Sequence, residues 1–415
     1  MLWMCLTLVP FAFFISFIIS GALIRIGHRL GTFDSAGVAG QIKAARRKVP
    51  NTGGVAIVLA LLIPLITLVS LVVILAPIAE NQSNNGDSGL SASESLLIPE
   101  KLSDFVPGIA AQAPLAFLFI ASVLLLHILG LVDDRKPLGP FLKLGVMLVP
   151  AIGVPLITTL SPTLADTRLL TALDAYVGGA WLSIAITAIW FLVMINAMNF
   201  MDNMDGLSAG VGAIAALCLL AGALHNEQWF VAAMLALMVG GLIGFLMFNA
   251  PRPGGAKIFM GDGGSIVVGF TLAFLTTRLT YVPLNLPEFG LERMNANAWW
   301  VPLVPLLVLA IPLYDFTSVV VLRLRQRKSP FVGDLQHFSH RLVELGLTRA
   351  RAVYVIWGFA LVTGLAGVSV MATLSPWAAA TAWGSTTSLL CVLALLEFSA
   401  RSARTQQKQA EKATS

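Results

Sequence analysis

The segment NAMNFMDNMDGLSAG, residues 196–210, concentrates carboxylate and carboxamide side chains within an otherwise apolar region. These side chains are Asn196, Asn199, Asp202, Asn203 and Asp205. The first four are spaced i, i+3, i+6 and i+7, so a helix would present them on one face. One such residue can simply cap a helix end, but five in one stretch indicate a further role. Carboxylate and carboxamide oxygens suit a hard cation such as Mg²⁺, which completes its shell with water and phosphate oxygens.

A second polar turn, MGDGGS, carries Asp262 and immediately precedes another apolar segment. Gly261, Gly263 and Gly264 lack Cβ atoms, so their backbone amides can approach a ligand closely. The N-terminus of a helix also attracts anions. Simple N-capping by Asp262 is the alternative interpretation. Together with the 196–210 segment, the turn predicts a site for a metal-bound pyrophosphate.

The stretch VDDRKP places Asp133 and Asp134 side by side at the end of a further apolar run. Adjacent carboxylates repel each other, so a nearby cation would help to keep both ionised. Lys143, ten residues after Asp133, can pair with them or bind phosphate. Alternatively, Asp133 and Asp134 are solvated acids of a loop, and Lys143 extends toward the lipid headgroups without a role in a site.

The stretch DLQHFSHR contains Asp334, His337, His340 and Arg341 within a positively charged loop. The i, i+3 spacing of the two histidines raises the possibility of zinc, but the loop lacks a third histidine or a cysteine for the usual ligand set. Groups that grip a diphosphate fit the loop better, and Arg341 is the strongest of them.

The elements that must position these residues are membrane helices. The chain of 415 residues is 57% hydrophobic and 11% charged, with a mean hydropathy of +0.86, whereas about a quarter of the residues of a soluble domain are charged. Eleven apolar runs approach or exceed the roughly 20 residues that cross a bilayer. They cover about 4–26, 53–79, 112–132, 141–160, 181–200, 206–224, 228–249, 263–283, 300–322, 353–373 and 379–398. We therefore expect an all-α integral membrane protein, because lipid-exposed backbone must be satisfied within helices or a closed barrel.

The distribution of positive charge predicts the orientation. With the N-terminus outside, 22 of the 26 Lys and Arg residues fall in inside segments, which follows the positive-inside rule. Every polar cluster then lies at a helix end on the cytoplasmic face, where one composite site can form. The net charge of +5 thus reflects topology and lipid headgroups, and we expect a lipid bilayer and no nucleic acid as partner.

We expect one catalytic membrane domain over residues 1–398, with an extracytoplasmic loop at 80–111 and a cytoplasmic loop at 323–352. A charged tail, 399–415, is expected to be disordered. A transporter is the main rival class, but transporters place polar residues near the bilayer midplane within broken helices. Asp315, in the ninth run, is the one candidate of that kind.

The motifs resemble those of the polyprenyl-phosphate N-acetylhexosamine-1-phosphate transferases of glycosyltransferase family 4. That family has an Asp-Asp pair after the third helix, an NxxNxxDGxDGL-like stretch, an MGDxGS-like turn and a His-rich cytoplasmic loop. The corresponding segments here are 133–134, 196–207, 260–265 and 334–341, and RKVPNTGGVAI resembles a further loop before the second helix.

The resemblance implies roles for individual residues. Asn199 and Asp262 match the positions that bind Mg²⁺, with Mn²⁺ as an alternative ion. The catalytic groups would be Asp133, Asp134, Lys143, His337 and Arg341. Substrate-binding positions would be Lys48, Thr52, Asn196, Asp202, Asp205, Phe259, Asp334 and His340, of which Asp205 and Phe259 face the nucleotide.

The resemblance further implies a UDP-sugar donor, a polyprenyl phosphate acceptor and release of UMP at the cell inner membrane. The His340-Arg341-Leu342 ending favours the branch that uses UDP-N-acetylglucosamine over the phospho-N-acetylmuramoyl-pentapeptide transferases. Asn203, Leu335 and Ser339 depart from the family pattern. A non-catalytic lipid-phosphate-binding protein is the other alternative, and a homodimer is compatible with the sequence.

Overall fold

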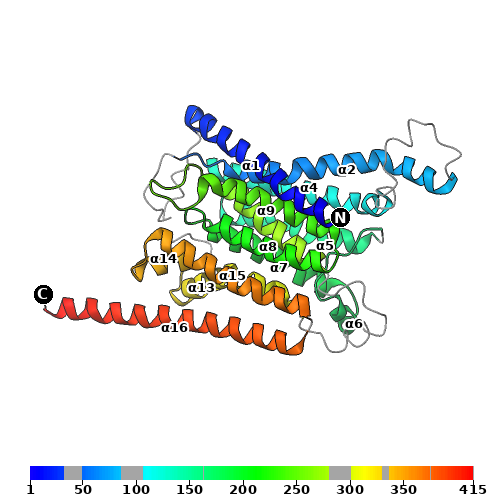
Figure 1. Cartoon of the computed structure of the whole chain (residues 1–415). Coiled ribbons are helices and arrows are strands. Elements are labelled where there is room, and N and C mark those ends of the chain that lie inside the picture. Colours follow the sequence, from blue (N-terminus) through cyan, green and yellow to red (C-terminus); the bar gives the residue numbers. More distant parts are fainter. Residues whose placement is uncertain are drawn as a thin grey trace.

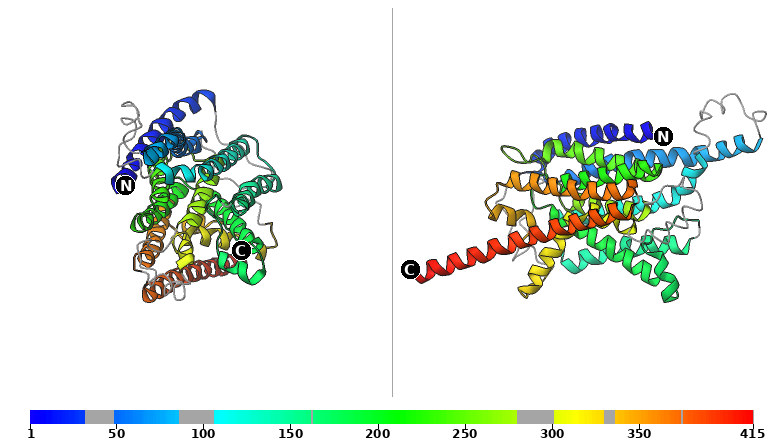
Figure 2. Two further views of the ribbon diagram at one scale, coloured as in Figure 1. Left: turned by 90° about the vertical axis from the view of Figure 1, so that its right-hand side faces the viewer. Right: turned by 60° about the horizontal axis from the view of Figure 1, so that its bottom comes forward.

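The computed structural model describes residues 1–31, 49–85, 106–161, 163–279, 301–329, 336–373 and 375–414, and in these ranges every regular element is helical. Figure 1 shows the long helices side by side along one direction, and Figure 2 shows the same bundle from two other sides. The long elements are α1 (Leu2–Leu30), α2 (Gly53–Asn85), α4 (Val106–Arg135), α5 (Pro140–Leu160), α7 (Trp181–Met201), α8 (Leu207–His225), α9 (Trp229–Asn249), α10 (Asp262–Arg278), α13 (Ala310–Arg325), α15 (Arg349–Thr373) and α16 (Pro376–Thr414).

Nine helices of the described ranges are long and apolar enough to cross a membrane, so the chain is a multi-pass helical membrane protein. Two of the eleven expected spans differ. The run 263–283 corresponds to α10, which has 17 residues. The run 300–322 is interrupted: η3 (Val301–Leu303) is followed by α12 (Val304–Val308), and one residue, Leu309, separates α12 from α13. Pro312 accounts for this break, because proline has no N–H to donate to the carbonyl four residues earlier, that of Val308.

Helix α10 forms the centre of the bundle. Its residues from Gly263 to Thr276 are all buried, and it packs against α4, α7 and α2. A helix that is apolar on every side has no face for solvent and belongs in such a core. The first turn of α10 is consequently surrounded by the ends of three other helices.

Exposed aromatic side chains mark one end of the bundle. Trp3, Tyr176, Trp181 and Trp377 are all strongly exposed and lie at the first turns of α1, α7 and α16 or in the short α6 (Asp174–Val177). In Figure 1 the N-terminus, α6 and the start of α16 lie at the right, and the C-terminus lies at the left. Amphipathic Trp and Tyr rings favour the headgroup level of a bilayer, so this end sits at a membrane surface.

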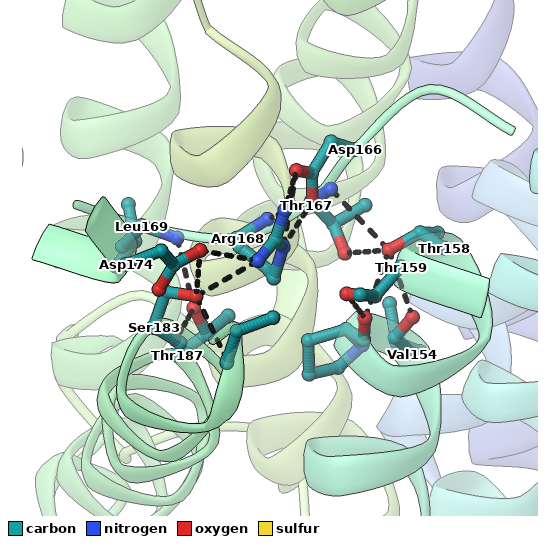
Figure 3. Close-up of polar contacts among 12 residues, drawn as sticks. Val154, Thr158, Thr159, Asp166, Thr167, Arg168, Leu169, Asp174, Ser183 and Thr187 are labelled. Carbon is teal, nitrogen blue, oxygen red and sulfur yellow. Dashed lines mark hydrogen bonds and ion pairs between the residues drawn. The ribbon is translucent and has the colours of Figure 1, made fainter. Parts of the chain in front are cut away.

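A network of hydrogen bonds and ion pairs stabilises the segment that connects α5 to α7 at this aromatic end (Figure 3). The Arg168 guanidinium lies 2.8 Å from Asp166 and 2.5 Å from Asp174, and it donates to the Ser183 hydroxyl at 3.0 Å. The Leu169 amide donates to the Thr187 hydroxyl on α7 at 2.8 Å. The network therefore fastens the connection to α7, far along the bundle from the clusters described below.

Helix α16 continues to Thr414 in the structure. The segment 399–414, which the sequence predicts to be disordered, is thus an extension of the last helix, visible at the lower left of Figure 1.

Candidate active site

Main-chain hydrogen bonds join the loop before α2 to the loop before α10. The amides of Gly53 and Gly54 donate to the carbonyls of Phe259 and Met260 at 2.9 and 2.8 Å, and the Phe259 amide donates to the Pro50 carbonyl at 2.9 Å. These bonds place Asn51 next to the turn that carries Asp262. The loop before α2 and the turn before α10 are thus joined directly through their main chains.

Asp134 lies at the N-terminus of α10. Its carboxylate accepts hydrogen bonds from the amides of Asp262, at 3.1 Å, and Gly263, at 3.4 Å, and from the Asn51 side chain at 3.0 Å. Gly261 adopts a φ of +72°, and a Cβ there would come within 2.5 Å of Asp134 Oδ2. An acidic side chain that receives the first amides of a helix stabilises that helix end. Asp134 therefore acts as an anchor for the turn.

Asp133 faces a different partner from its neighbour. Its Oδ2 lies 3.0 Å from Lys143 Nζ, and its Oδ1 accepts the Leu138 amide at 2.6 Å. Lys143 also forms an ion pair with Asp262 Oδ2. One ammonium group on α5 thus bridges a carboxylate at the end of α4 and another at the start of α10. The expected proximity of Lys143 to the aspartate pair is present in the structure.

Asn199 completes this group from α7. Its side chain donates to Asp262 Oδ1 at 2.8 Å and to the Ser265 hydroxyl at 3.0 Å. Asn196, one turn earlier, instead donates to the Leu192 carbonyl of its own helix at 2.7 Å. The predicted polar face therefore divides, with Asn199 reaching the carboxylates and Asn196 turned to its own backbone.

Asp202 ends α7 and lies near the same carboxylates. Desolvation, together with the negative charges of Asp262 and Asp134, raises the pKa of the Asp202 carboxyl well above its ordinary value of 3.8. A bound cation would oppose that effect, because it favours ionised oxygen ligands. Asp205, farther along the turn, accepts the Ala256 amide at 2.9 Å and so ties this turn to the loop before α10.

The histidine segment approaches the end of α7 through α14 (Phe338–Glu344). Ser339 Oγ donates to Asn203 Oδ1 at 2.5 Å, and the His337 ring meets the Phe200 ring edge-on at 5.4 Å between centroids. His337 Nδ1 lies 3.0 Å from the buried carboxylate of Asp315, which also accepts the Phe338 amide at 2.5 Å. Asp315 thus supports the histidine segment and is no isolated midplane charge.

His340 is half-buried on the same short helix. Burial and the positive charges of His337 and Arg349 lower the pKa of the His340 imidazole from an ordinary 6.5 to about 4, against the opposing influence of Asp315. His340 is therefore neutral near pH 7.

Arg341 contacts residues of α13, α16 and its own segment rather than the carboxylates around Asp262. Its side chain is 2% exposed and forms an ion pair with Glu397 of α16 at 2.9 Å. It also donates to the Gln336 carbonyl at 2.6 Å and the Ser318 hydroxyl at 2.8 Å. These partners fasten α14 to α13 and α16. In the structure Arg341 thus joins helices, and the positive charge in contact with Asp262 is that of Lys143.

For the remaining predicted site residues, the structure gives few side-chain contacts or none. Lys48 and Asp334 lie outside the described residues. The Thr52 hydroxyl is buried without a hydrogen-bond partner among the described residues. Phe259 contributes its backbone to the pairing with Pro50.

Four residues of the site environment were not singled out from the sequence: Asn51, His127, Ser265 and Glu397. His127 could have been found from the sequence, because it precedes Asp134 by seven residues and so lies on the same face of the helix. Asn51 stood inside a polar cluster already noted. The pairing of Glu397 with Arg341 spans distant helices, which no local pattern indicates.

The oxygen ligands for a divalent cation are present but few. In the described part of the chain, no group of three His, Cys, Asp or Glu side chains is arranged to hold a metal ion. Asp262, with the Asn199 carboxamide beside it and Asp202 nearby, is instead a sparse set of oxygen donors. Such a set suits Mg²⁺, which keeps several waters and is often completed by substrate phosphates.

The fold and the site together define a polytopic helical membrane protein with a carboxylate- and lysine-containing site at one end of its bundle. Residues 116–280 match the family described as glycosyl transferase family 4. This segment is thus similar to a family 4 glycosyl transferase domain, and the resemblance drawn from the motifs is confirmed.

Several curated proteins are similar to part of the chain. The chain is 27% identical over 241 residues to a probable undecaprenyl-phosphate N-acetylglucosaminyl 1-phosphate transferase of Bacillus subtilis, covering 58% of this chain and 62% of the relative. It is 29% identical over 283 residues to a decaprenyl-phosphate N-acetylglucosaminephosphotransferase of Mycolicibacterium smegmatis, covering 65% and 66%. A Haemophilus influenzae undecaprenyl-phosphate alpha-N-acetylglucosaminyl 1-phosphate transferase is 29% identical over 267 residues, covering 62% and 68%. The match thus spans slightly less than two thirds of the first two relatives.

Proposed function

We propose that the protein transfers N-acetylglucosamine-1-phosphate from UDP-N-acetylglucosamine to a polyprenyl phosphate, such as undecaprenyl phosphate, and releases UMP. The observation that carries this proposal is the contact of Lys143 with both Asp133 and Asp262. A cation held between carboxylates at the end of a helical bundle suits chemistry on phosphates at a membrane surface. The names of the relatives support both the acceptor class and the transferred group.

The proposed site lies at the cytoplasmic surface of the inner membrane, with the N-terminus outside. The charge distribution supports this orientation, since 22 of the 26 basic residues fall on the side of the site under the topology derived above. The exposed side chains of Trp3, Tyr176, Trp181 and Trp377 lie at the opposite end of the bundle, which fits a second membrane surface there. The donor nucleotide would approach from the cytoplasm and the lipid acceptor from within the bilayer.

Asp262 and Asn199 are the residues proposed to hold Mg²⁺, with Mn²⁺ as an alternative. Their oxygens fit a hard cation, and the Asp202 carboxyl, whose pKa is raised by burial and by the charges of Asp262 and Asp134, lies near the same turn. The assignment of oxygen and nitrogen in an asparagine side chain is interchangeable, so Asn199 can turn its oxygen toward a cation. A bound divalent cation would supply charge stabilisation for the diphosphate.

The chain's own residues would divide the remaining work. An oxygen of the acceptor phosphate forms a bond to the sugar-bearing phosphorus, and the bond from that phosphorus to the bridging oxygen breaks, so that UMP leaves with the electron pair. Lys143 would stabilise negative charge on the diphosphate. Asp133 would orient the acceptor phosphate or receive its last proton, and a route through an aspartyl-phosphate is the alternative. Asp134 would hold the turn that presents Asp262.

The proposal is tested by measuring UMP release from purified protein with undecaprenyl phosphate, a panel of UDP-sugars, and either Mg²⁺ or EDTA. We expect release with UDP-N-acetylglucosamine that requires both the lipid and Mg²⁺ and disappears in Asp262→Asn. Asp166→Asn, the same change at the opposite end of the bundle, should retain release. Activity with UDP-N-acetylmuramoyl-pentapeptide alone would move the donor assignment to the other branch. No UMP from any donor, in protein shown to be folded, would overturn the transferase function.

A further inference from the structure

One face of α4 contacts the first turn of α10 through three residues. His127, Gly130 and Asp134 are spaced i, i+3 and i+7, so they lie on the same side of the helix. Asp134 accepts the amides of Asp262 and Gly263, as described above. His127 Nδ1 lies 2.8 Å from the carbonyl oxygen of Gly263. Asp134 therefore binds the amides of the first turn of α10, and His127 binds a carbonyl of the same turn.

The geometry determines the direction of the histidine bond. A carbonyl oxygen only accepts, so His127 must carry its proton on Nδ1 and donate. The side chain is buried, with 8% of the residue exposed. A carbonyl has two lone pairs, so this bond does not compete with a helical hydrogen bond to the same oxygen.

The third residue of this face explains how α4 comes so close. A Cβ on Gly130 would lie 2.3 Å from the Gly263 nitrogen and 2.4 Å from the Asp262 carbonyl carbon. Only glycine permits this approach, which brings the imidazole and the carboxylate within hydrogen-bond distance of one turn. The three residues form a single contact surface directed at the residues on either side of the Asp262–Gly263 peptide bond.

We propose that His127 is a positioning residue of the active site. By holding the Gly263 carbonyl, it fixes the orientation of the first turn of α10 and thereby directs the Asp262 carboxylate toward Lys143 and Asn199. The effect on Asp262 rests on the proposed function, in which Asp262 binds the metal ion. The hydrogen bond from His127 to the first turn of α10 does not depend on that function. Partners that orient a metal-binding group from behind commonly contribute ten- to a hundredfold to metal affinity or activity.

Two substitutions separate the hydrogen bond from the bulk of the side chain. His127→Leu keeps an apolar side chain in the buried space and removes the donor. His127→Asn retains an N–H donor close to the position of Nδ1. Ser122→Ala is the matched control, because Ser122 is buried on the same helix but donates to the Leu118 carbonyl of α4 itself, at 2.8 Å.

The first readout is amide hydrogen exchange of the segment 259–266, measured by mass spectrometry on folded, detergent-solubilised protein. We expect faster exchange in His127→Leu, by about tenfold, and exchange close to that of the unsubstituted protein in His127→Asn and Ser122→Ala. The second readout is Mn²⁺ binding followed by electron paramagnetic resonance, which does not depend on turnover. The Mn²⁺ concentration for half-saturation should rise about ten- to a hundredfold in His127→Leu and recover in His127→Asn.

Asp262→Asn, measured in parallel, separates the two proposals. If Asp262→Asn loses Mn²⁺ binding while His127→Leu matches the unsubstituted protein in both exchange and binding, the positioning role is overturned and the metal site stands. If Asp262→Asn binds Mn²⁺ and releases UMP normally, the proposed function of Asp262 fails, and faster exchange in His127→Leu still supports the hold on the turn.

Discussion

At the scale of single residues, the site depends on which charged groups share a partner. Asp133 and Asp134 are adjacent in the sequence, yet one pairs with Lys143 and the other receives the amides of α10. Lys143 is the group common to α4, α5 and α10. Replacement of one member of such a half-buried cluster leaves the others without compensation.

Lys143→Gln should lower UMP release by about a hundred- to a thousandfold, because the stabilisation of charge on the diphosphate is lost. Lys136→Gln, at an exposed lysine seven positions earlier, is the control and should remain active. The measurement is the initial rate of UMP release at saturating substrates, together with size-exclusion chromatography to confirm folding. Normal turnover in Lys143→Gln would remove Lys143 from the chemistry.

His340 gives a prediction on pH. Its folded-state pKa of about 4 lies below the ordinary 6.5, so the protonated form favours the unfolded chain. The corresponding stability is fully present above pH 6.5 and is lost as the pH falls toward 4. His340→Gln should therefore lose less thermal stability between pH 7 and pH 5 than the unsubstituted protein. The difference in midpoint should be about 1 °C, because a contribution of about 1 kcal/mol after solvent screening is divided by the large unfolding entropy of a 415-residue chain.

The control for this prediction is His225→Gln, at an exposed histidine of α8. Its thermal midpoint should change with pH as that of the unsubstituted protein does. An equal loss of stability in His340→Gln and the unsubstituted protein between pH 7 and pH 5 would contradict the assignment.

At the scale of elements, the short helix α14 is attached to the bundle rather than to the carboxylate group. The Arg341 guanidinium lies between Glu397 of α16 and Ser318 of α13, over the rings of Tyr314 and Phe338. Asp315 holds the first residues of α14 from α13. The last helix thus supports the segment that carries the histidines.

A double-mutant cycle on Arg341 and Glu397 should detect this attachment. Arg341→Met and Glu397→Leu should each destabilise the protein, because each leaves one buried charge without its partner. The double substitution should cost less than the sum, with a coupling of about 0.5–3 kcal/mol in unfolding free energy. Additive effects on stability, combined with a raised KM for the UDP-sugar only in Arg341→Met, would instead place Arg341 on the donor diphosphate.

At the scale of the whole molecule, the bundle separates two polar ends. The end that carries Asp262 holds the clustered carboxylates, Lys143 and the histidine segment, whereas the other end holds Trp3, Tyr176, Trp181, Trp377 and the Arg168 network (Figure 3). Helix starts and ends alternate between these surfaces, so the orientation of the chain decides which compartment reaches the site.

The orientation can be tested by cysteine labelling in intact cells, after replacement of the three native cysteines. Tyr176→Cys, an exposed position at the aromatic end, should react with a membrane-impermeant maleimide without permeabilisation. Lys328→Cys, exposed after α13, should react only after permeabilisation. The reverse pattern would place the N-terminus in the cytoplasm and the site outside.

The sequence by itself determined the class of fold and most of the residues that the candidate site brings together. Long apolar runs must form helices, because the backbone N–H and C=O groups in lipid need hydrogen-bond partners within the segment. The Asp, Asn and Gly motifs at the ends of these runs indicated where the polar side chains cluster. Local pattern also predicted that Lys143 and Asp262 belong to one site, and the structure brings them into contact.

Only the tertiary structure decided what each polar group does there. The separate partners of Asp133 and Asp134, the hold of His127 on Gly263 and the pairing of Arg341 with Glu397 join segments 10 to 136 residues apart. The side chain of Asn196 bonds to its own helix rather than to Asp262, and that choice likewise depends on three-dimensional surroundings. Spacing along a helix specifies the face on which a residue lies, but its partner depends on which other helix packs against that face.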